Sequence, residues 1–202
     1  MRLGLGARLL KEDSVKAVPP NRYLIFFSLA TVGCLVDLAT KSWVFRWLGG
    51  PGERPPWWII EGVFGFQTSL NRGALFGMGQ GLVHLFSLLS LLAVVAIVYW
   101  LFVQRAACDR LLTIALGSIT GGILGNLYDR LGLPGLTWKP GWVLGDADLV
   151  GGPVHAVRDW IHVVIIRWPW PTFNLADSML VCGALLLVWH ALARPPHDAQ
   201  PT

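Results

Sequence analysis

The chain alternates between long apolar runs and short polar stretches. The clearest run covers residues 82–103 (LVHLFSLLSLLAVVAIVYWLFV) and contains no Asp, Glu, Lys or Arg. At about 1.5 Å per residue, a helix of this length crosses about 30 Å of hydrocarbon. Three further runs, at about 23–44, 111–128 and 173–193, are apolar with polar residues near one end. A soluble helix bundle needs polar faces at helical spacing, which residues 88–98 lack, so the pattern predicts an all-α membrane protein with four transmembrane helices.

The segments between the runs predict a small sheet and a long loop. Residues 57–77 (WWIIEGVFGFQTSLNRGALFG) alternate in places like strands and then contain glycines, so we expect a small extracytoplasmic β-cradle. Residues 131–156 are rich in Gly and Pro and long for a loop, which indicates an extracytoplasmic insertion or a functional lid. Residues 23–193 then form a single four-helix membrane domain. We expect the polar tails 1–22 and 194–202 to be cytoplasmic.

Basic residues and tryptophans are distributed unequally between the two ends of the runs. Lys and Arg are dense in the N-terminal tail and in the short connection around 105–110, which predicts cytoplasmic termini. Most tryptophans lie toward the opposite end, where indole rings favour the headgroup boundary: Trp43, Trp47, Trp57, Trp58, Trp138, Trp142, Trp160, Trp168 and Trp170. The first run lacks a small-x-small cleavage site and contains Asp37 and Lys41, so we interpret it as a span and not as a signal peptide.

Composition excludes several classes of function. Charged residues make up 14% of the chain, against about a quarter in soluble domains. The net charge of +4 is too small to indicate nucleic-acid binding. The three cysteines form no CxxC and the five histidines no HExxH, so we expect neither a metal nor a cofactor. The sequence has no GxSxG, which argues against a serine nucleophile.

Polar residues inside and beside the runs gather at one predicted membrane depth. They come from four segments: Asp37 and Lys41; Asn126, Asp129 and Arg130; Asp159; and Asn174 and Asp177. An unpaired charge at the bilayer centre costs about 2.5–3.5 kcal/mol, so each needs a reason. Taken singly, Asp37 and Lys41 could form an ion pair within a helix. Asp129 and Arg130 could form a charge pair at a helix end, and Asn174 could be an N-cap. Taken together, they predict a polar site at the outer boundary.

A pair of carboxylates is the chemistry that remains. Two aspartates held close together cannot both ionise, so one keeps its proton. The charged one can activate a water while the other protonates the carbonyl oxygen or the leaving amine. This combination predicts peptide hydrolysis without a metal. The alternatives are a small ion-coupled membrane transporter that uses the same carboxylates, and a non-catalytic membrane scaffold.

Five short motifs follow one another in a specific order. They are DLATK (37–41), NRGALF (71–76), GGILGNLYDR (121–130), VRDW (157–160) and FNLAD (173–177). In this order, with four spans between them, they resemble the bacterial lipoprotein signal peptidase (signal peptidase II) family. The resemblance implies an intramembrane aspartic endopeptidase with Asp159 and Asp177 as its catalytic pair. It also implies supporting or substrate-binding roles for eight further residues. Asn126, Asp129, Arg130 and Asn174 would surround the pair. Asn71 and Gly73 would contact the substrate backbone, and Asp37 with Lys41 would brace the site.

The same resemblance implies a substrate and a location. The substrate would be a prolipoprotein, cleaved just before a diacylglyceryl-modified cysteine. The enzyme would lie in the bacterial cytoplasmic (inner) membrane, in contact with lipid, as a monomer with its active site at the outer face. It would need no cofactor and bind no nucleic acid.

Two features depart from the family pattern. The segment between Arg130 and Asp159 is longer than the short link of the family, and it contains Asp146 and Asp148 as rival carboxylates. We retain Asp159 because VRDWI keeps the flanking pattern, whereas VLGDADL does not. Leu75 replaces a residue that is usually small and Trp160 one that is usually Phe, and either change can reshape the pocket.

Overall fold

Four long helices form the body of the protein. The computed structural model describes residues 17–73, 79–142 and 147–193. The helices are α1 (Pro20–Leu48), α2 (Val83–Val98, continued by a π-helical turn over Tyr99–Val103), α3 (Arg110–Arg130) and α4 (Leu175–Ala193). All four are long and apolar enough to cross a membrane. The four-helix membrane fold expected from the sequence is therefore confirmed.

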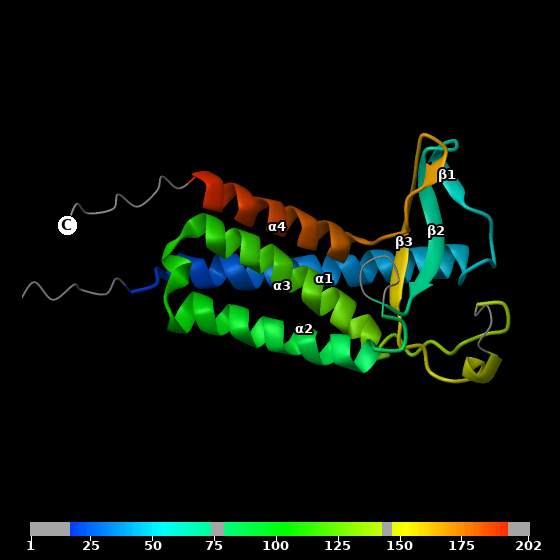
Figure 1. Cartoon of the computed structure of the whole chain (residues 1–202), viewed down its shortest axis with the longest axis horizontal. Coiled ribbons are helices and arrows are strands. Elements are labelled where there is room, and N and C mark those ends of the chain that lie inside the picture. The colour runs from blue at the N-terminus through cyan, green and yellow to red at the C-terminus, as the bar shows by residue number, and fades with distance from the viewer. Residues whose placement is uncertain (1–16, 74–78, 143–146, 194–202) are drawn as a thin grey trace, which may run out of the picture.

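Helix α1 is longer than the apolar run that predicts it. It begins at Pro20, where a proline fits the first helical turn because no intrahelical partner is needed for its missing N–H. It ends at Gly49, whose φ of 78° few other residues adopt. The last turn, in which Arg46 stands among apolar residues, thus extends beyond the run that ends at about residue 44. This extension carries the C-terminal end of α1 up to the sheet (Figure 1).

Helix α3 lies at the centre of the bundle and packs against α1, α2 and α4. Two adjacent glycines permit the closest approaches. A Cβ on Gly121 would lie 3.1 Å from the Ala30 carbonyl oxygen of α1, and one on Gly122 would lie 2.5 Å from the Ala176 carbonyl oxygen of α4. Small residues at such crossings allow helices to pack closely in a membrane. The polar residues of α1, α3 and α4 are thereby brought within reach of one another.

A small antiparallel sheet covers one end of the bundle, here called the sheet end (Figure 1). Its strands are β1 (Trp57–Ile60), β2 (Phe64–Asn71), β3 (Val157–Ile165) and β4 (Trp168–Pro169), in the order β1-β2-β3-β4. The two described chain ends, near residues 17 and 193, lie at the opposite end of the bundle (Figure 1). The predicted β-cradle thus exists, but β3 and β4 were not predicted. The run of Val and Ile in VRDWIHVVI is the signal that could have indicated β3.

The segment 131–156 folds back on itself beside the sheet. The Trp138 N–H donates to the Gly152 carbonyl oxygen at 2.9 Å, and Thr137 pairs with Pro153 in an antiparallel bridge. Trp138, Val154 and Ala156 form a small core against Leu70 of β2. Trp138 and Trp160 are buried, so these two rings are core residues and not the membrane-boundary residues predicted from the sequence.

Candidate active site

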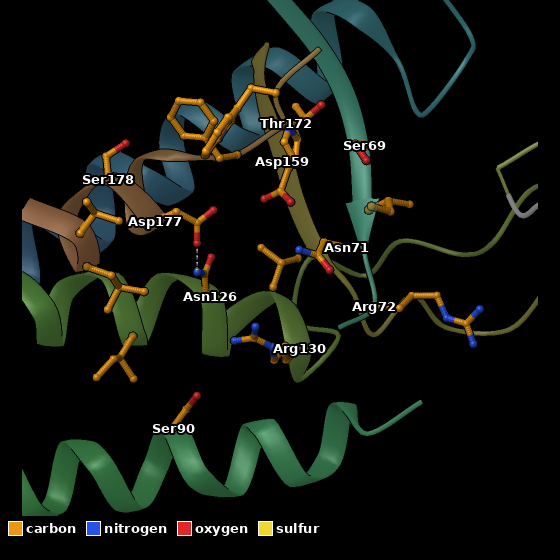
Figure 2. Close-up of a pocket in the computed structure, with 18 of the residues that line it drawn as sticks. Ser69, Asn71, Arg72, Ser90, Asn126, Arg130, Asp159, Thr172, Asp177 and Ser178 are labelled. Atoms are coloured by element: carbon orange, nitrogen blue, oxygen red, sulfur yellow. Dashed lines mark hydrogen bonds between the residues drawn. The ribbon is translucent and has the colours of Figure 1, made fainter. Parts of the chain in front are cut away.

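Asp159 and Asp177 meet at the sheet end of the bundle. Asp159 lies on β3 opposite Ser69 of β2, and Asp177 lies in the first turn of α4. Figure 2 shows the two carboxylates turned toward the same space, one from the strand and the other from the helix. Both line a cavity of about 860 Å³, together with Asn71, Asn126 and other side chains. The structure therefore brings the proposed catalytic pair into one cavity.

The N-terminus of α4 holds both carboxylates through Asn174. The Asp177 N–H donates to Asn174 Oδ1 at 2.9 Å, and the Asn174 N–H donates to Asp177 Oδ2 at 3.2 Å. This reciprocal arrangement has the form of a capping box, in which a cap and the third helical residue satisfy each other's N–H groups. The Asn174 side-chain amide also donates to Asp159 Oδ1 at 2.6 Å. One residue thus fixes the helix start and both members of the pair.

Asn126 of α3 supports the pair from below in Figure 2. Its amide nitrogen donates to Asp177 Oδ1 at 2.9 Å. Its carbonyl oxygen accepts from Lys41 Nζ at 2.9 Å and from Asn174 Nδ2 at 3.2 Å. Because both ends of the amide have partners of defined polarity, its orientation is fixed. Asn126 therefore connects Asp177 to the charged residues beneath.

A buried group of two cations and two anions lies next to the pair. Lys41 Nζ lies 2.7 Å from Asp37 Oδ2 and 3.2 Å from Asp129 Oδ2. The Arg158 guanidinium contacts Asp129 Oδ1 through Nε at 2.9 Å and through Nη2 at 2.8 Å. Asp37 Oδ1 also accepts the N–H of Ala176 in α4 at 2.9 Å. This charge quartet joins α1, α3, β3 and α4 with no net charge.

Arg130 does not pair with its neighbour Asp129, contrary to the simple charge-pair interpretation. Asp129 is engaged by Lys41 and Arg158, while Arg130 lines the cavity and donates to the Gly73 carbonyl oxygen at 3.4 Å. The Gly73 N–H in turn donates to Asn71 Oδ1 at 3.0 Å. Residues adjacent in a helix point about 100° apart, which explains the separation of the two side chains. The partner of Asp129 that the sequence analysis missed is Arg158.

Asp159 has an unusual protonation equilibrium. Its burial, with only 2% of the residue exposed, raises the pKa of Asp159 to about 8. The negative charge of Asp177 is the second contribution to this raised pKa. Hydrogen bonds from Asn174 and Asn71 and the charge of Lys41 oppose the rise only in part. At neutral pH, Asp159 therefore keeps its proton.

Of the two rival residues of the long segment, the structure describes Asp148, which lies away from the pair. Asp148 is exposed, on a short 3-10 turn over Ala147–Leu149, and does not line the cavity of the pair. Asp146 and Leu75 lie outside the described residues. Trp160 packs edge-on against Phe66 at 5.0 Å and does not line the cavity, so its predicted influence on the pocket is not found.

Comparison with known proteins now identifies the family. The sequence profile of signal peptidase (SPase) II matches residues 29–193. The chain belongs to the signal peptidase II family. It is 50% identical over 173 residues to the lipoprotein signal peptidase of Rhodopirellula baltica, covering 85% of this chain and 73% of that one. It is 35% identical over 165 residues to the lipoprotein signal peptidase of Anoxybacillus flavithermus, covering 81% and 83%.

Solved structures show the same fold. A bacterial membrane enzyme superimposes with a TM-score of 0.67 at 22% identity, covering 93% of this chain and 96% of the other. A second one gives a TM-score of 0.64 at 24% identity, covering 89% and 97%. Membership of the signal peptidase II family makes the chain a peptidase and a multi-pass protein of the inner membrane.

The charge quartet predicts a large effect of Lys41→Met. Removing the ammonium leaves Asp37 and Asp129 buried with one fewer cation, so we expect the free energy of unfolding to fall by about 3–5 kcal/mol. Lys139→Met is the matched control, because Lys139 forms an exposed ion pair with Glu53 and exposed pairs contribute about 0–1 kcal/mol. Unfolding in detergent, followed by circular dichroism, measures both variants.

A second substitution separates loss of charge from loss of packing. In Lys41→Met/Asp37→Asn the surplus carboxylate is removed, so part of the lost stability should return. Equal stability of Lys41→Met and Lys139→Met would contradict the role assigned to the quartet.

Proposed function

We propose that the protein is an aspartic endopeptidase that removes signal peptides from prolipoproteins, cleaving just before a diacylglyceryl-modified cysteine. The observation that carries the proposal is the pair Asp159 and Asp177, joined through Asn174 in one cavity. The family, and the lipoprotein signal peptidases to which the chain is similar, support the substrate class.

The two carboxyl groups have different environments and hence different roles. Asp159 is the protonated member, because its pKa of about 8 lies above neutral pH. Asp177 accepts hydrogen bonds from the Asn126 amide and from the Asn174 N–H at the start of α4. Donors and a helix N-terminus both favour a negative charge. Asp177 is therefore the general base and Asp159 the general acid.

Hydrolysis then needs only these two residues and one water. The Asp177 carboxylate removes a proton from water while the water oxygen attacks the scissile carbonyl carbon, and Asp159 gives its proton to the carbonyl oxygen. In the breakdown step, Asp177 returns its proton to the amide nitrogen and the carbon–nitrogen bond breaks. Asp159 regains a proton from a hydroxyl of the intermediate. A carboxylic acid and an amine leave, and the pair again holds one proton.

The cavity has a composition that suits a lipidated peptide in a membrane. Its helical walls contain Ile123 of α3 and Leu180 and Val181 of α4, beyond the pair toward the middle of the bundle. Its sheet-end wall contains Asn71 and Arg130. We assign the apolar part to acyl chains and the signal helix, and Asn71 and Gly73 to the substrate backbone. The sheet end would face the outer side of the membrane, the termini would be cytoplasmic, and a monomer in contact with lipid contains the whole site.

The transporter alternative fits the arrangement less well. Proton or ion transport needs polar groups along a path through the bilayer. The carboxylates of Asp37, Asp129, Asp159 and Asp177 instead gather at the sheet end of the bundle. This clustering favours a hydrolytic site at one face.

Separate Asp159→Asn and Asp177→Asn substitutions test the catalytic pair. Each should abolish cleavage of a diacylglyceryl-modified prolipoprotein in detergent, because one removes the transferable proton and the other the base. Asp148→Asn and Asp146→Asn are the controls, and both should cleave like the unmodified protein. Full cleavage by Asp159→Asn together with loss in either control would refute the assignment, provided that all variants unfold at similar temperatures.

The pH profile tests the protonation of the pair. Because the pKa of Asp159 is about 8, the pair loses its last proton above that pH. We expect kcat/KM to fall about tenfold per pH unit above about pH 8. A rate that stays constant to pH 10 with unmodified substrate would show that no proton on Asp159 is needed.

The same equilibrium affects stability in a defined direction. Between the ordinary pKa of 3.8 and the raised value of about 8, the unfolded chain ionises Asp159 while the folded chain keeps it protonated. The unfolded state then binds fewer protons, so stability falls as pH rises through this interval, by up to about 1.4 kcal/mol per unit. Asp159→Asn should remove this contribution and flatten the curve of melting temperature against pH between 5 and 8. An unchanged slope would contradict the raised pKa.

A further inference from the structure

A second cavity lies behind strand β3. Val157 and Asp159 line the cavity of the catalytic pair, whereas the Arg158 side chain lines a separate cavity of about 590 Å³. Successive side chains of a strand point to opposite faces, so β3 separates the two cavities. Small-molecule sites typically measure about 300–1,000 Å³, so the second cavity is large enough for a ligand.

The segment 131–156 builds one wall of this cavity, and none of its described residues lines the first. Leu133, Leu136, Lys139 and Trp142 line it, opposite Arg46 and other residues of α1. Glu53, in the turn after α1, holds this wall in place, because its carboxylate accepts from Lys139 Nζ at 3.1 Å and from Trp142 Nε1 at 3.0 Å. The described part of the long segment therefore closes a cavity beside that of Asp159 and Asp177.

The charges that line this cavity are mainly positive. Arg46, Lys139 and Arg158 face one carboxylate, that of Glu53. Glu53 is paired with Lys139, and Asp129 with Arg158. Among the described residues, Arg46 has no ion pair or hydrogen bond with another side chain.

The guanidinium of Arg158 has N–H groups that form no hydrogen bond within the described residues. A guanidinium has five N–H groups. Those of Arg158 make two side-chain contacts with Asp129 and one with the Ser42 hydroxyl at 3.2 Å. Two N–H groups thus remain for a ligand, beside the hydroxyl of Ser42. Forked donors of this kind match the oxygens of a phosphate group.

The residues around this cavity are of the kinds found at the membrane–water boundary. Arg46 is in the last turn of the span α1, and Trp43 on the preceding turn is 56% exposed. Exposed indoles mark the membrane–water boundary. Leu133, which is 55% exposed, and Phe45 add apolar surface to the cavity wall. Arg46 could also stabilise α1 simply by placing a positive charge at the negative end of the helix dipole. That role alone would not require a cavity or a second arginine.

We propose that the second cavity binds the phosphate-bearing headgroup of an anionic membrane lipid, which contacts Arg46 and Arg158. The phosphate oxygens accept from the two guanidinium groups, and the glycerol part lies against Phe45 and Leu133. This lipid is distinct from the substrate, because β3 separates it from the catalytic pair.

Counting bound lipid tests the proposal on the full chain. The protein is purified in detergent and titrated with phosphatidylglycerol or phosphatidylcholine, and retained lipid is counted by native mass spectrometry. We expect one phosphatidylglycerol to bind in preference to phosphatidylcholine. Arg46→Gln should weaken it about tenfold, as expected for one lost charge-assisted contact. Arg54→Gln, an exposed arginine of the same region that does not line the cavity, should bind like the unmodified protein.

A second pair of variants guards against misfolding of Arg46→Gln. Leu133→Glu places a carboxylate in the cavity wall and should also weaken phosphatidylglycerol binding. Leu131→Glu is its control, because Leu131 is exposed nearby and does not line the cavity. Equal binding by both members of either pair would overturn the proposal. If inorganic phosphate or glycerol phosphate bound as tightly as the lipid, the proposal that the bound phosphate group belongs to a lipid would be refuted.

Discussion

The requirement that buried charges cancel determines how the sheet end is built. Lys41, Asp37, Asp129 and Arg158 lie out of water, where an uncompensated charge costs several kcal/mol. Each therefore has an oppositely charged partner within 3.2 Å, and these partners come from α1, α3 and β3. Since Asp37 also accepts the Ala176 N–H, the start of α4 is fixed by the same group. These contacts restrict how the helices and the strand can lie relative to one another, and the resulting arrangement holds Asp159 and Asp177 in one cavity.

The asymmetry of the pair follows from the elements that carry it. Asp159 is on a strand whose residues are buried on both faces, so desolvation dominates its titration. Asp177 is at the third position of a helix, where N–H groups and the helix dipole are available to an anion. Asn126 and Asn174 donate hydrogen bonds to the two carboxyl groups. Because both amides are neutral, they position these groups without forming an ion pair with either. In the proposed mechanism, a strand and a helix N-terminus thus make an acid and a base out of two identical side chains.

Local pattern predicted most of the fold and many of the residues of the site. The spans follow from apolar runs, and Asn174 with Asp177 has the spacing of a helix cap, which the structure contains. Strand β3 was missed because its continuous burial removes the alternation by which β2 was recognised, and because its partner strand lies far away in sequence. The pairing of Arg158 with Asp129 depends on that strand and on α3 together. Contacts of this kind cannot be read from spacing within either segment.

The two cavities on either side of β3 are linked by polar contacts. Asp159 faces the catalytic cavity, and Arg158 faces the one closed by the segment 131–156. From Arg158 a continuous series of polar contacts runs through Asp129, Lys41 and Asn126 to Asp177. An anion that draws on the free donors of Arg158 changes the electrostatic potential at Asp129 without needing any movement of the backbone. The described part of the segment 131–156 lines the cavity on the Arg158 side of β3, so a ligand bound there as proposed would act on the pair through this series of contacts and not through the substrate cavity.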